Sequence, residues 1–215
     1  MDTQVRSRVM SKKKVGIIDY GAGNLGSIYN AIKYLDVQTK IISLPSDLSQ
    51  FSHLILPGVG SFGKLSDNLK KKDYPNKIKD FVQKGNNLFG VCVGMQLLFE
   101  QSEESKNATG LNLIKGSFKI FDKLNDLPLP HIGFNEVLHK NTPIWKGIKN
   151  KSPFYFIHSF NIKKTQDDVI SAKTVYGKEF ISFIEKDNIY GSQFHPEKSH
   201  YVGLKLLKNF LEINN

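Results

Sequence analysis

The chain has 215 residues, of which 40% are hydrophobic and 23% are charged, and its formal net charge is +10. This composition is typical of one soluble globular domain, and no apolar run approaches the roughly 18 residues that a membrane span requires. Among the 30 basic residues only Arg6 and Arg8 are arginine. Because arginine supplies the bidentate contacts that read bases, the positive charge indicates a solvated lysine-rich surface and argues against a nucleic-acid partner.

The two ends and the single cysteine set further bounds. Residues 1–13 are polar and basic and lack the apolar stretch of a secretory signal, so we expect a disordered extension on a cytoplasmic protein. Residues 14–215 are expected to form one domain. Cys92 is the only cysteine and cannot form an internal disulfide, so it is either a small buried hydrophobe or a reactive thiol.

The first half of the chain alternates predicted strands and helices. Short apolar runs end at Gly or Pro, and apolar residues recur at helical spacing between them. This alternation predicts a parallel sheet covered by helices, with functional residues at the carboxyl ends of the strands. The predicted strands cover 14–19, 40–44, 54–57 and 87–91, and the predicted helices cover 25–35 and 77–84.

The second half is rich in strand-like segments, and antiparallel hairpins are expected there. Together the two halves predict an α/β fold with a mixed central sheet and additional antiparallel strands towards the C-terminus. A final helix over 201–211 places Val202, Leu206 and Phe210 on one face. The predicted strands cover 118–121, 136–139, 154–157, 169–175, 181–185 and 189–194.

Residues 90–94, GVCVG, have the spacing of a nucleophile elbow between a predicted strand and a helix-like segment. The sharp turn brings the backbone close to itself on both sides, which leaves room only for glycine at Gly90 and Gly94. A helix N-terminus also favours a thiolate. The pattern therefore favours Cys92 as a nucleophile over a packed core cysteine.

A cysteine nucleophile needs a base, and His195 is the candidate among six histidines. It follows the apolar run 189–194, and Pro196 makes the chain rigid behind it. Glu197 lies two residues further, on the same side of an extended chain, where it can orient the imidazole. The order Cys92, His195, Glu197 supplies nucleophile, base and orienting carboxylate for thiol-based acyl transfer.

Two glycine-rich segments leave alternatives open. Residues 58–63, GVGSFG, follow a predicted strand and could point backbone N–H groups at an oxyanion, or could be a plain turn. Residues 21–26, GAGNLG, match the dinucleotide-binding pattern, and Asp47 lies near the position of a ribose-binding acid. A nicotinamide-dependent oxidoreductase is therefore a remote competitor, although it would leave Cys92, His195 and Glu197 unexplained.

Several longer motifs occur in order along almost the whole domain: 19–24 (DYGAGN), 56–63 (LPGVGSFG), 90–99 (GVCVGMQLLF), 131–135 (HIGFN), 154–159 (FYFIHS) and 193–199 (QFHPEKS). In these motifs the chain resembles the class I (triad) glutamine amidotransferases, and among them the glutaminase subunits of imidazole glycerol phosphate synthases. The family has a flavodoxin-like α/β fold.

The resemblance implies that Cys92 attacks the carboxamide of L-glutamine, His195 shuttles protons and Glu197 orients His195. It gives the chain no cofactor and no metal. By their positions in the motifs, further residues resemble the glutamine-binding and oxyanion sites, with the amides of Gly60 and Val93 as oxyanion donors. These residues are Gly58, Gly60, Val93, Gln96 and Glu104.

The resemblance also implies a partner, a (β/α)8-barrel cyclase subunit that receives the ammonia and makes imidazole glycerol phosphate and an aminoimidazole carboxamide ribotide. The family usually has tryptophan where this chain has Phe134, and often tyrosine where it has Phe160. The positions that match the partner interface are Asn24, Phe134, Tyr155 and Lys198.

Two other readings stay open within this fold. Similar subunits donate ammonia for amidination of nucleotide-linked surface sugars with a different barrel partner. A regulatory protein could also keep the fold without catalysis, although the presence of Cys92, His195 and Glu197 argues against that.

Overall fold

The computed structural model describes residues 13–122 and 127–214. The predicted N-terminal extension, residues 1–13, lies outside this range except for Lys13. The Nζ of Lys13 donates a hydrogen bond to the carbonyl of Ile213 at 2.7 Å, which ties the start of the described chain to its end. No helix in these described segments is long and apolar enough to cross a membrane.

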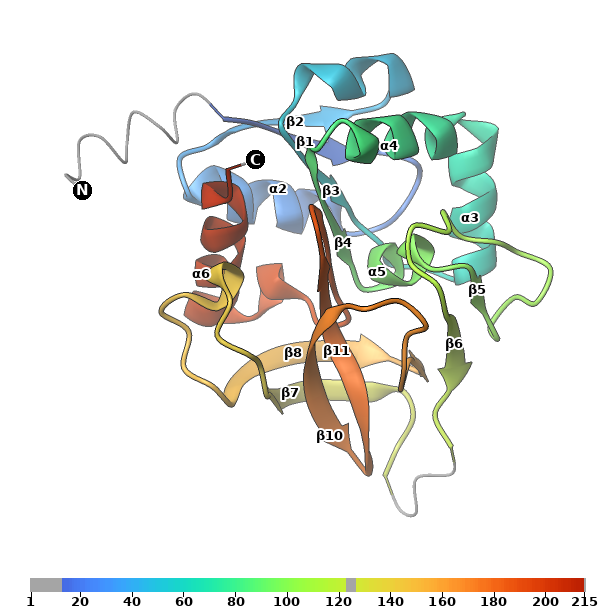
Figure 1. Cartoon of the computed structure of the whole chain (residues 1–215), viewed down its shortest axis with the longest axis vertical. Helices are drawn as coiled ribbons and strands as arrows, with labels where there is room; N and C mark the ends of the chain where they lie inside the picture. Colours follow the sequence, from blue (N-terminus) through green and yellow to red (C-terminus); the bar gives the residue numbers. More distant parts are fainter. Residues whose placement is uncertain (1–12, 123–126, 215) are drawn as a thin grey trace.

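A seven-stranded sheet in the order β10-β11-β12-β4-β3-β1-β2 forms the centre of the molecule (Figure 1). The five strands β12, β4, β3, β1 and β2 run parallel to one another. β11 pairs with β12 in the antiparallel sense, and β10 and β11 form an antiparallel hairpin at that edge of the sheet. The mixed α/β sheet is confirmed. The bounds are β1 Lys14–Ile18, β2 Gln38–Ile42, β3 His53–Leu56, β4 Asn87–Val91, β10 Ile170–Tyr176, β11 Lys178–Lys186 and β12 Ile189–Ser192.

Helices cover both faces of the sheet. α2 and α6 lie on one side and α3, α4 and α5 on the other (Figure 1), and a short 3-10 turn, η1 (Pro45–Gln50), packs near α4. α2, α3, α4 and α6 each bury one apolar stripe, whereas all six residues of α5 are buried. The bounds are α2 Leu25–Tyr34, α3 Phe62–Lys71, α4 Tyr74–Gln83, α5 Val93–Leu98 and α6 His200–Glu212.

The helix α3 was not predicted. The sequence predicts an oxyanion segment or a plain turn over residues 58–63, but Phe62 and Gly63 lie inside this helix. Its apolar stripe consists of Phe62, Leu65 and Leu69, all buried, among lysine, serine, asparagine and aspartate. Three apolar residues in ten give a weak periodic signal, and the adjacent glycine motif obscured it.

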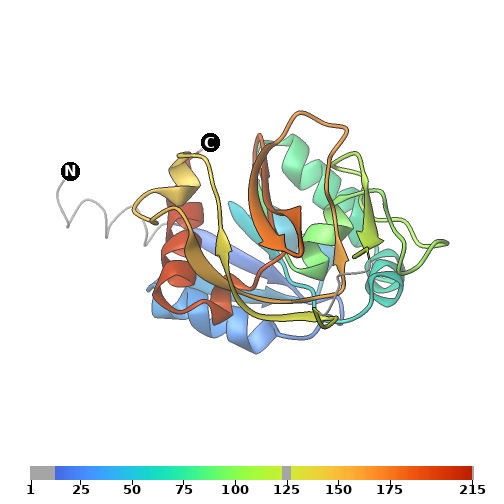
Figure 2. The same cartoon turned by 90° about the horizontal axis from the view of Figure 1, so that it is seen from below.

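The second half adds an antiparallel ribbon of β7 (His131–Val137) and β8 (Ser152–His158), which runs from the region of α6 towards the β10–β11 hairpin (Figure 2). The strand predicted at 136–139 begins five residues earlier, because a half-exposed ribbon that contains Gly133 lacks a continuous apolar run. A small second sheet contains β5 (Gln101–Ser102), β6 (Ser117–Ile120) and β9 (Phe160–Asn161), and two 3-10 turns are η2 (Pro143–Trp145) and η3 (Pro196–Lys198).

The register of the central strands determines where functional residues meet. All five residues of β4 and all four of β12 are buried, and the two strands pair in parallel with Val91 opposite Ser192. The residues that follow each strand therefore leave the sheet at the same level. Cys92 follows β4 directly, and the 193–199 motif follows β12.

Candidate active site

Cys92 lies in a sharp turn between β4 and α5. Its φ is 56° and its ψ is −113°, a backbone conformation that side chains rarely adopt. A Cβ on Gly94 would stand 1.9 Å from the carbonyl oxygen of Leu56, and one on Gly90 would stand 2.6 Å from that of Gly94. The predicted elbow is present, and it holds Cys92 through close backbone packing that only glycine permits.

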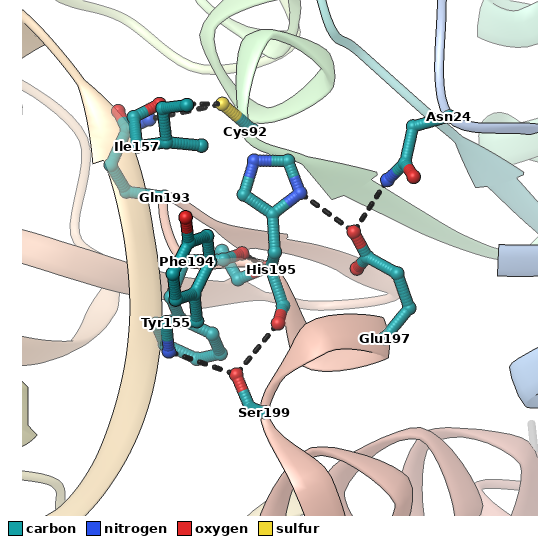
Figure 3. A network of polar contacts seen from close by, with 10 residues as sticks. Asn24, Cys92, Tyr155, Ile157, Gln193, Phe194, His195, Glu197 and Ser199 are labelled. Carbon is teal, nitrogen blue, oxygen red and sulfur yellow. Dashed lines mark hydrogen bonds and ion pairs between the residues drawn. The ribbon is translucent and has the colours of Figure 1, made fainter. Parts of the chain in front are cut away.

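His195 and Glu197 form a buried pair beside this cysteine. Nδ1 of His195 is 2.7 Å from Oε1 of Glu197, and the two side chains are 1% and 0% exposed. The imidazole lies between Cys92 and the carboxylate (Figure 3). Its Nε2 has no hydrogen-bond partner among the described residues. The structure thus brings the three predicted residues together in the order that base catalysis requires.

The electrostatics of His195 favour its protonated form. Burial alone would lower the pKa of His195, but the interactions with Cys92, and then the hydrogen bond and charge of Glu197, outweigh it. They raise the pKa of His195 to about 10. An imidazolium next to Cys92 stabilises a thiolate there.

Asn24 supports the carboxylate, a contact that sequence reasoning missed. Its Nδ2 donates a hydrogen bond to Oε1 of Glu197 at 2.5 Å (Figure 3). Asn24 has a left-handed φ of 73° immediately before α2. The motif match predicts only a partner-interface role for Asn24, because a contact over 173 residues leaves no local signal in the sequence.

A cavity of 260 Å³ opens above Cys92. Of the predicted glutamine-site residues, Gly60, Val93 and Glu104 line it, whereas Gly58 and Gln96 do not. Gln96 is instead buried behind the nucleophile, with its Oε1 unpaired and its Nε2 3.4 Å from Oε1 of Gln193. The other lining residues are Pro130, Ile157, His158, Ser159 and Phe160, together with Val59, Cys92 and His195.

The backbone of 57–62, which we call the oxyanion loop, is held along its length. The N–H of Val93, a predicted oxyanion donor, donates to the carbonyl of Gly58 at 3.2 Å. Gly23 N–H donates to Val59 O at 3.1 Å. This arrangement satisfies the Val93 amide within the protein, so the predicted donor does not point freely into the cavity.

Two side chains hold the ends of the oxyanion loop. The hydroxyl of Tyr20 donates to the carbonyl of Pro57, and burial, followed by the charge of Cys92, raises the pKa of Tyr20 so that it stays a donor. Glu104 accepts the N–H of Phe62 at 2.8 Å, at the first residue of α3. Glu104 therefore lines the cavity and also supports the start of this helix.

The other predicted interface residues gather on one exposed face. Phe134 is 49% exposed and stacks on His200, with ring centroids 5.2 Å apart, and it contacts Tyr155 edge to face at 5.4 Å. Nζ of Lys198 lies 5.9 Å from the centre of the Tyr155 ring. Two more apolar residues of the same ribbon, Ile132 and Ile157, are 56% and 39% exposed. Isolated exposed apolar residues are common, but such a cluster beside a site indicates a docking surface.

The dinucleotide alternative gains no support from the geometry. Asp47 lies in η1, where it pairs with Lys40 at 3.4 Å and accepts a hydrogen bond from Gln50. The 21–26 segment reaches the oxyanion loop and Glu197 through Gly23 and Asn24. Within the described ranges no group of three or more His, Cys, Asp or Glu is arranged to hold a metal ion.

Comparison with known proteins identifies the family. Residues 16–213 match the family described as glutamine amidotransferase class-I. The HisH subunit of imidazole glycerol phosphate synthase from Helicobacter hepaticus is 45% identical, over 95% of this chain and 100% of its own length. The HisH subunit from Methanocaldococcus jannaschii is 44% identical, over 93% and 99%.

Solved structures agree in fold. A crystal structure of a glutamine amidotransferase has a TM-score of 0.74 at 18% identity and covers 92% of this chain and 97% of its own. The structure of PurLQS from Thermotoga maritima has the same score at 20% identity and covers 93% and 98%. The chain belongs to the class I glutamine amidotransferase family, and within it to the HisH subunits of imidazole glycerol phosphate synthase.

Proposed function

We propose that this chain hydrolyses L-glutamine to glutamate and ammonia and passes the ammonia to a (β/α)8-barrel cyclase subunit, HisF, in histidine biosynthesis. The observation that carries the proposal is the buried His195, placed between Cys92 and Glu197 with its Nε2 unpaired. The matches to HisH subunits support the histidine pathway over amidination of surface sugars.

In the first half of the reaction, the Cys92 thiolate attacks the carboxamide carbon of glutamine and forms a tetrahedral oxyanion. The carbon–nitrogen bond then breaks. The leaving nitrogen takes the proton from Nε2 of His195 and departs as ammonia, which leaves a glutamyl thioester on Cys92. Because Nδ1 is held by Glu197, Nε2 is the nitrogen available for this proton transfer.

In the second half, water gives a proton to Nε2 of His195 and attacks the thioester carbon. The carbon–sulfur bond breaks, the thiolate of Cys92 is restored and glutamate leaves. Glu197 remains ionised throughout and stabilises the imidazolium, as an orienting carboxylate does in other triads. Asn24 holds the same carboxylate oxygen and so fixes its position.

The oxyanion loop supports a resting state of low activity. An oxyanion is stabilised by preorganised N–H groups, but the Val93 N–H already donates to Gly58. Activation therefore requires the Gly58 peptide to turn away from Val93. The exposed cluster of Phe134, Tyr155 and Lys198 is where the barrel subunit docks in this proposal. Tyr155 lies on β8, the strand that also supplies Ile157 to the cavity.

The test compares two nitrogen sources in the complex with the cyclase subunit. Cys92→Ala should lower glutamine-driven formation of imidazole glycerol phosphate by roughly 10⁴-fold or more. Formation driven by ammonium at high pH should persist, because the cyclase needs only ammonia. Substantial glutamine-driven turnover in the variant would sink the covalent mechanism. Failure of the wild-type chain to support the cyclase with glutamine, while the cyclase still uses ammonium, would favour the sugar-amidination reading.

A further inference from the structure

Gln193 is a fully buried polar residue to which the mechanism so far gives no role. It is the first residue after β12, as Cys92 is the first residue after β4, and the parallel register of the two strands places them side by side. Phe194 turns away into the aromatic core, with its ring 4.2 Å from that of Phe154. Gln193 and His195, two residues apart, therefore both reach Cys92 (Figure 3).

The sulfur of Cys92 has two polar neighbours besides His195. Its thiol can donate to the carbonyl of Ile157 at 3.8 Å, and Nε2 of Gln193 donates to it at 3.6 Å. The two contacts favour opposite states of the sulfur, because an acceptor stabilises the protonated thiol and a donor stabilises the thiolate. Without the Gln193 amide, only the contact with the Ile157 carbonyl, which favours the protonated thiol, would remain of these two.

The neighbour Gln96 sets the orientation of the Gln193 amide. Nε2 of Gln96 donates to Oε1 of Gln193 at 3.4 Å, so the oxygen end faces Gln96 and the nitrogen end faces the sulfur. Reversing only the Gln193 amide would set two NH₂ groups against each other and an oxygen lone pair against the thiolate. Both amides are buried, so water does not resolve such a conflict easily.

We infer that Gln193 is a second thiolate-stabilising residue: its amide N–H holds the Cys92 sulfur in the anionic form against the competing carbonyl of Ile157. This role rests on the proposed function of Cys92. A neutral amide has no proton to lose during turnover, whereas His195 gives its proton to the departing ammonia. Gln193 therefore offers an N–H to the sulfur in every step of the reaction, whereas Nε2 of His195 carries a proton in only some of them.

The test uses the fact that Cys92 is the only cysteine, so iodoacetamide reports its ionisation directly. The rate of alkylation of the full chain is measured against pH for wild type, Gln193→Met and Gln193→Glu. Methionine keeps the length of the side chain and removes the donor. The matched control is Gln38→Met, on an exposed position of β2. Thermal melting confirms that each variant is folded.

Gln193→Met should move the midpoint of alkylation upward by roughly one pH unit, the size of one hydrogen bond to a charged group. Gln193→Glu should move it further, because a carboxylate faces the sulfur. Gln38→Met should leave it unchanged. The glutaminase rate of Gln193→Met should recover towards wild type as the pH passes the new midpoint, which a merely structural defect would not do.

An unchanged or lowered midpoint of Cys92 alkylation in folded Gln193→Met overturns the inference. If that variant does not melt cooperatively, an unchanged or lowered midpoint in folded Gln193→Glu overturns it instead. Alkylation reports the sulfur whether or not glutamine is hydrolysed. A wild-type chain that is inactive with its cyclase therefore contradicts the proposed function, whereas active wild type with an unmoved midpoint contradicts only the role of Gln193.

Discussion

The two sides of the candidate site differ in how complete they are. On one side, Cys92, His195 and Glu197 are already assembled, buried and hydrogen-bonded by residues of distant segments. On the other side, the oxyanion loop is also held, but the carbonyl of Gly58 accepts the Val93 N–H, the donor that the proposed mechanism needs. The nucleophile side is therefore already arranged for the reaction, whereas on the oxyanion side the proposed donor is already hydrogen-bonded within the protein.

This difference shows how a glutaminase can be kept from releasing ammonia without a synthase to use it. A nucleophile held by close backbone packing cannot be moved cheaply, because every neighbour would have to move with it. A single peptide group in a glycine-rich loop can turn by giving up one hydrogen bond, without movement of the nucleophile elbow. Regulation by a partner is therefore expected at the Gly58–Gly60 backbone and not at the triad.

The largest expected effect is a loss of stability when the close backbone packing of the nucleophile elbow is disrupted. In Gly94→Ala the new Cβ would overlap the carbonyl of Leu56 at 1.9 Å, whereas Gly26→Ala in α2 meets nothing within 4 Å. We expect Gly94→Ala to lose about 4 kcal/mol or more, or not to fold, and Gly26→Ala to be neutral or stabilised by up to about 1 kcal/mol. Urea unfolding of both variants measures this, and equal stabilities would contradict the packing argument.

The second prediction concerns the other side. The isolated chain should hydrolyse glutamine slowly, and the cyclase subunit should raise kcat by about 10²–10³-fold, the typical effect of one oxyanion donor. Since the triad is already assembled, alkylation of Cys92 should change much less on binding than kcat does. Fast glutaminase turnover of the chain alone would mean that the Val93 N–H is not a limiting donor.

Most strands and helices of the first half could be predicted from the sequence, because they depend on the apolar pattern of consecutive residues. β4 was predicted with its correct bounds, since a run of five buried residues between a turn and an elbow is unambiguous. The helix α3 was missed because its three apolar residues were diluted by polar ones. In the half-exposed ribbon, the start of β7 was missed for a similar reason.

The contacts around the triad were accessible only in part. The elbow and the 193–199 motif indicated Cys92, His195 and Glu197, because the spacing itself carries the chemistry. The support of Glu197 by Asn24 and of Cys92 by Gln193 depends on strand order and register, which one sequence does not contain. The Val93–Gly58 hydrogen bond is a property of backbone orientation, and no residue type encodes it.

The third prediction tests how well the buried histidines outside the triad are sealed from water. Burial, and then the charge of Lys13, lowers the pKa of His53 to about 4, and burial lowers those of His131 and His158 to about 4 and 3. A folded-state pKa below the unfolded value near 6.5 means that the unfolded chain takes up protons first. The stability from these histidines is therefore full above pH 6.5 and declines as the pH falls below it.

Unfolding free energies measured by urea titration between pH 6.5 and 4.5 check this expectation. The raised pKa of His195 adds progressively less to the slope as the pH falls through this window, because below the unfolded value near 6.5 both states of that residue become protonated. His53→Gln should reduce the slope by up to about 1.4 kcal/mol per pH unit. His200→Gln, on an exposed residue, is the control and should leave the slope as it is. Identical slopes for His53→Gln and wild type would mean that water reaches this histidine.

The smallest expected effect concerns Lys198, and it tests whether the exposed face contributes to binding of the partner without contributing to catalysis. Lys198 follows Glu197 directly, but its ammonium group lies over Tyr155 and not in the cavity. An exposed charge that pairs across an interface contributes up to about 1 kcal/mol, so Lys198→Ala should weaken binding of the cyclase by roughly two- to fivefold. Lys208→Ala, at an exposed lysine on α6, should not change the affinity for the cyclase.

Because Lys198 touches neither Cys92 nor the oxyanion loop, kcat at saturating partner should stay close to wild type. If both affinity and stimulated rate were unchanged, Lys198 would not belong to the interface. If kcat fell while affinity held, the residue would act on the neighbouring Glu197, and the separation between a docking face and a preassembled triad would have to be abandoned.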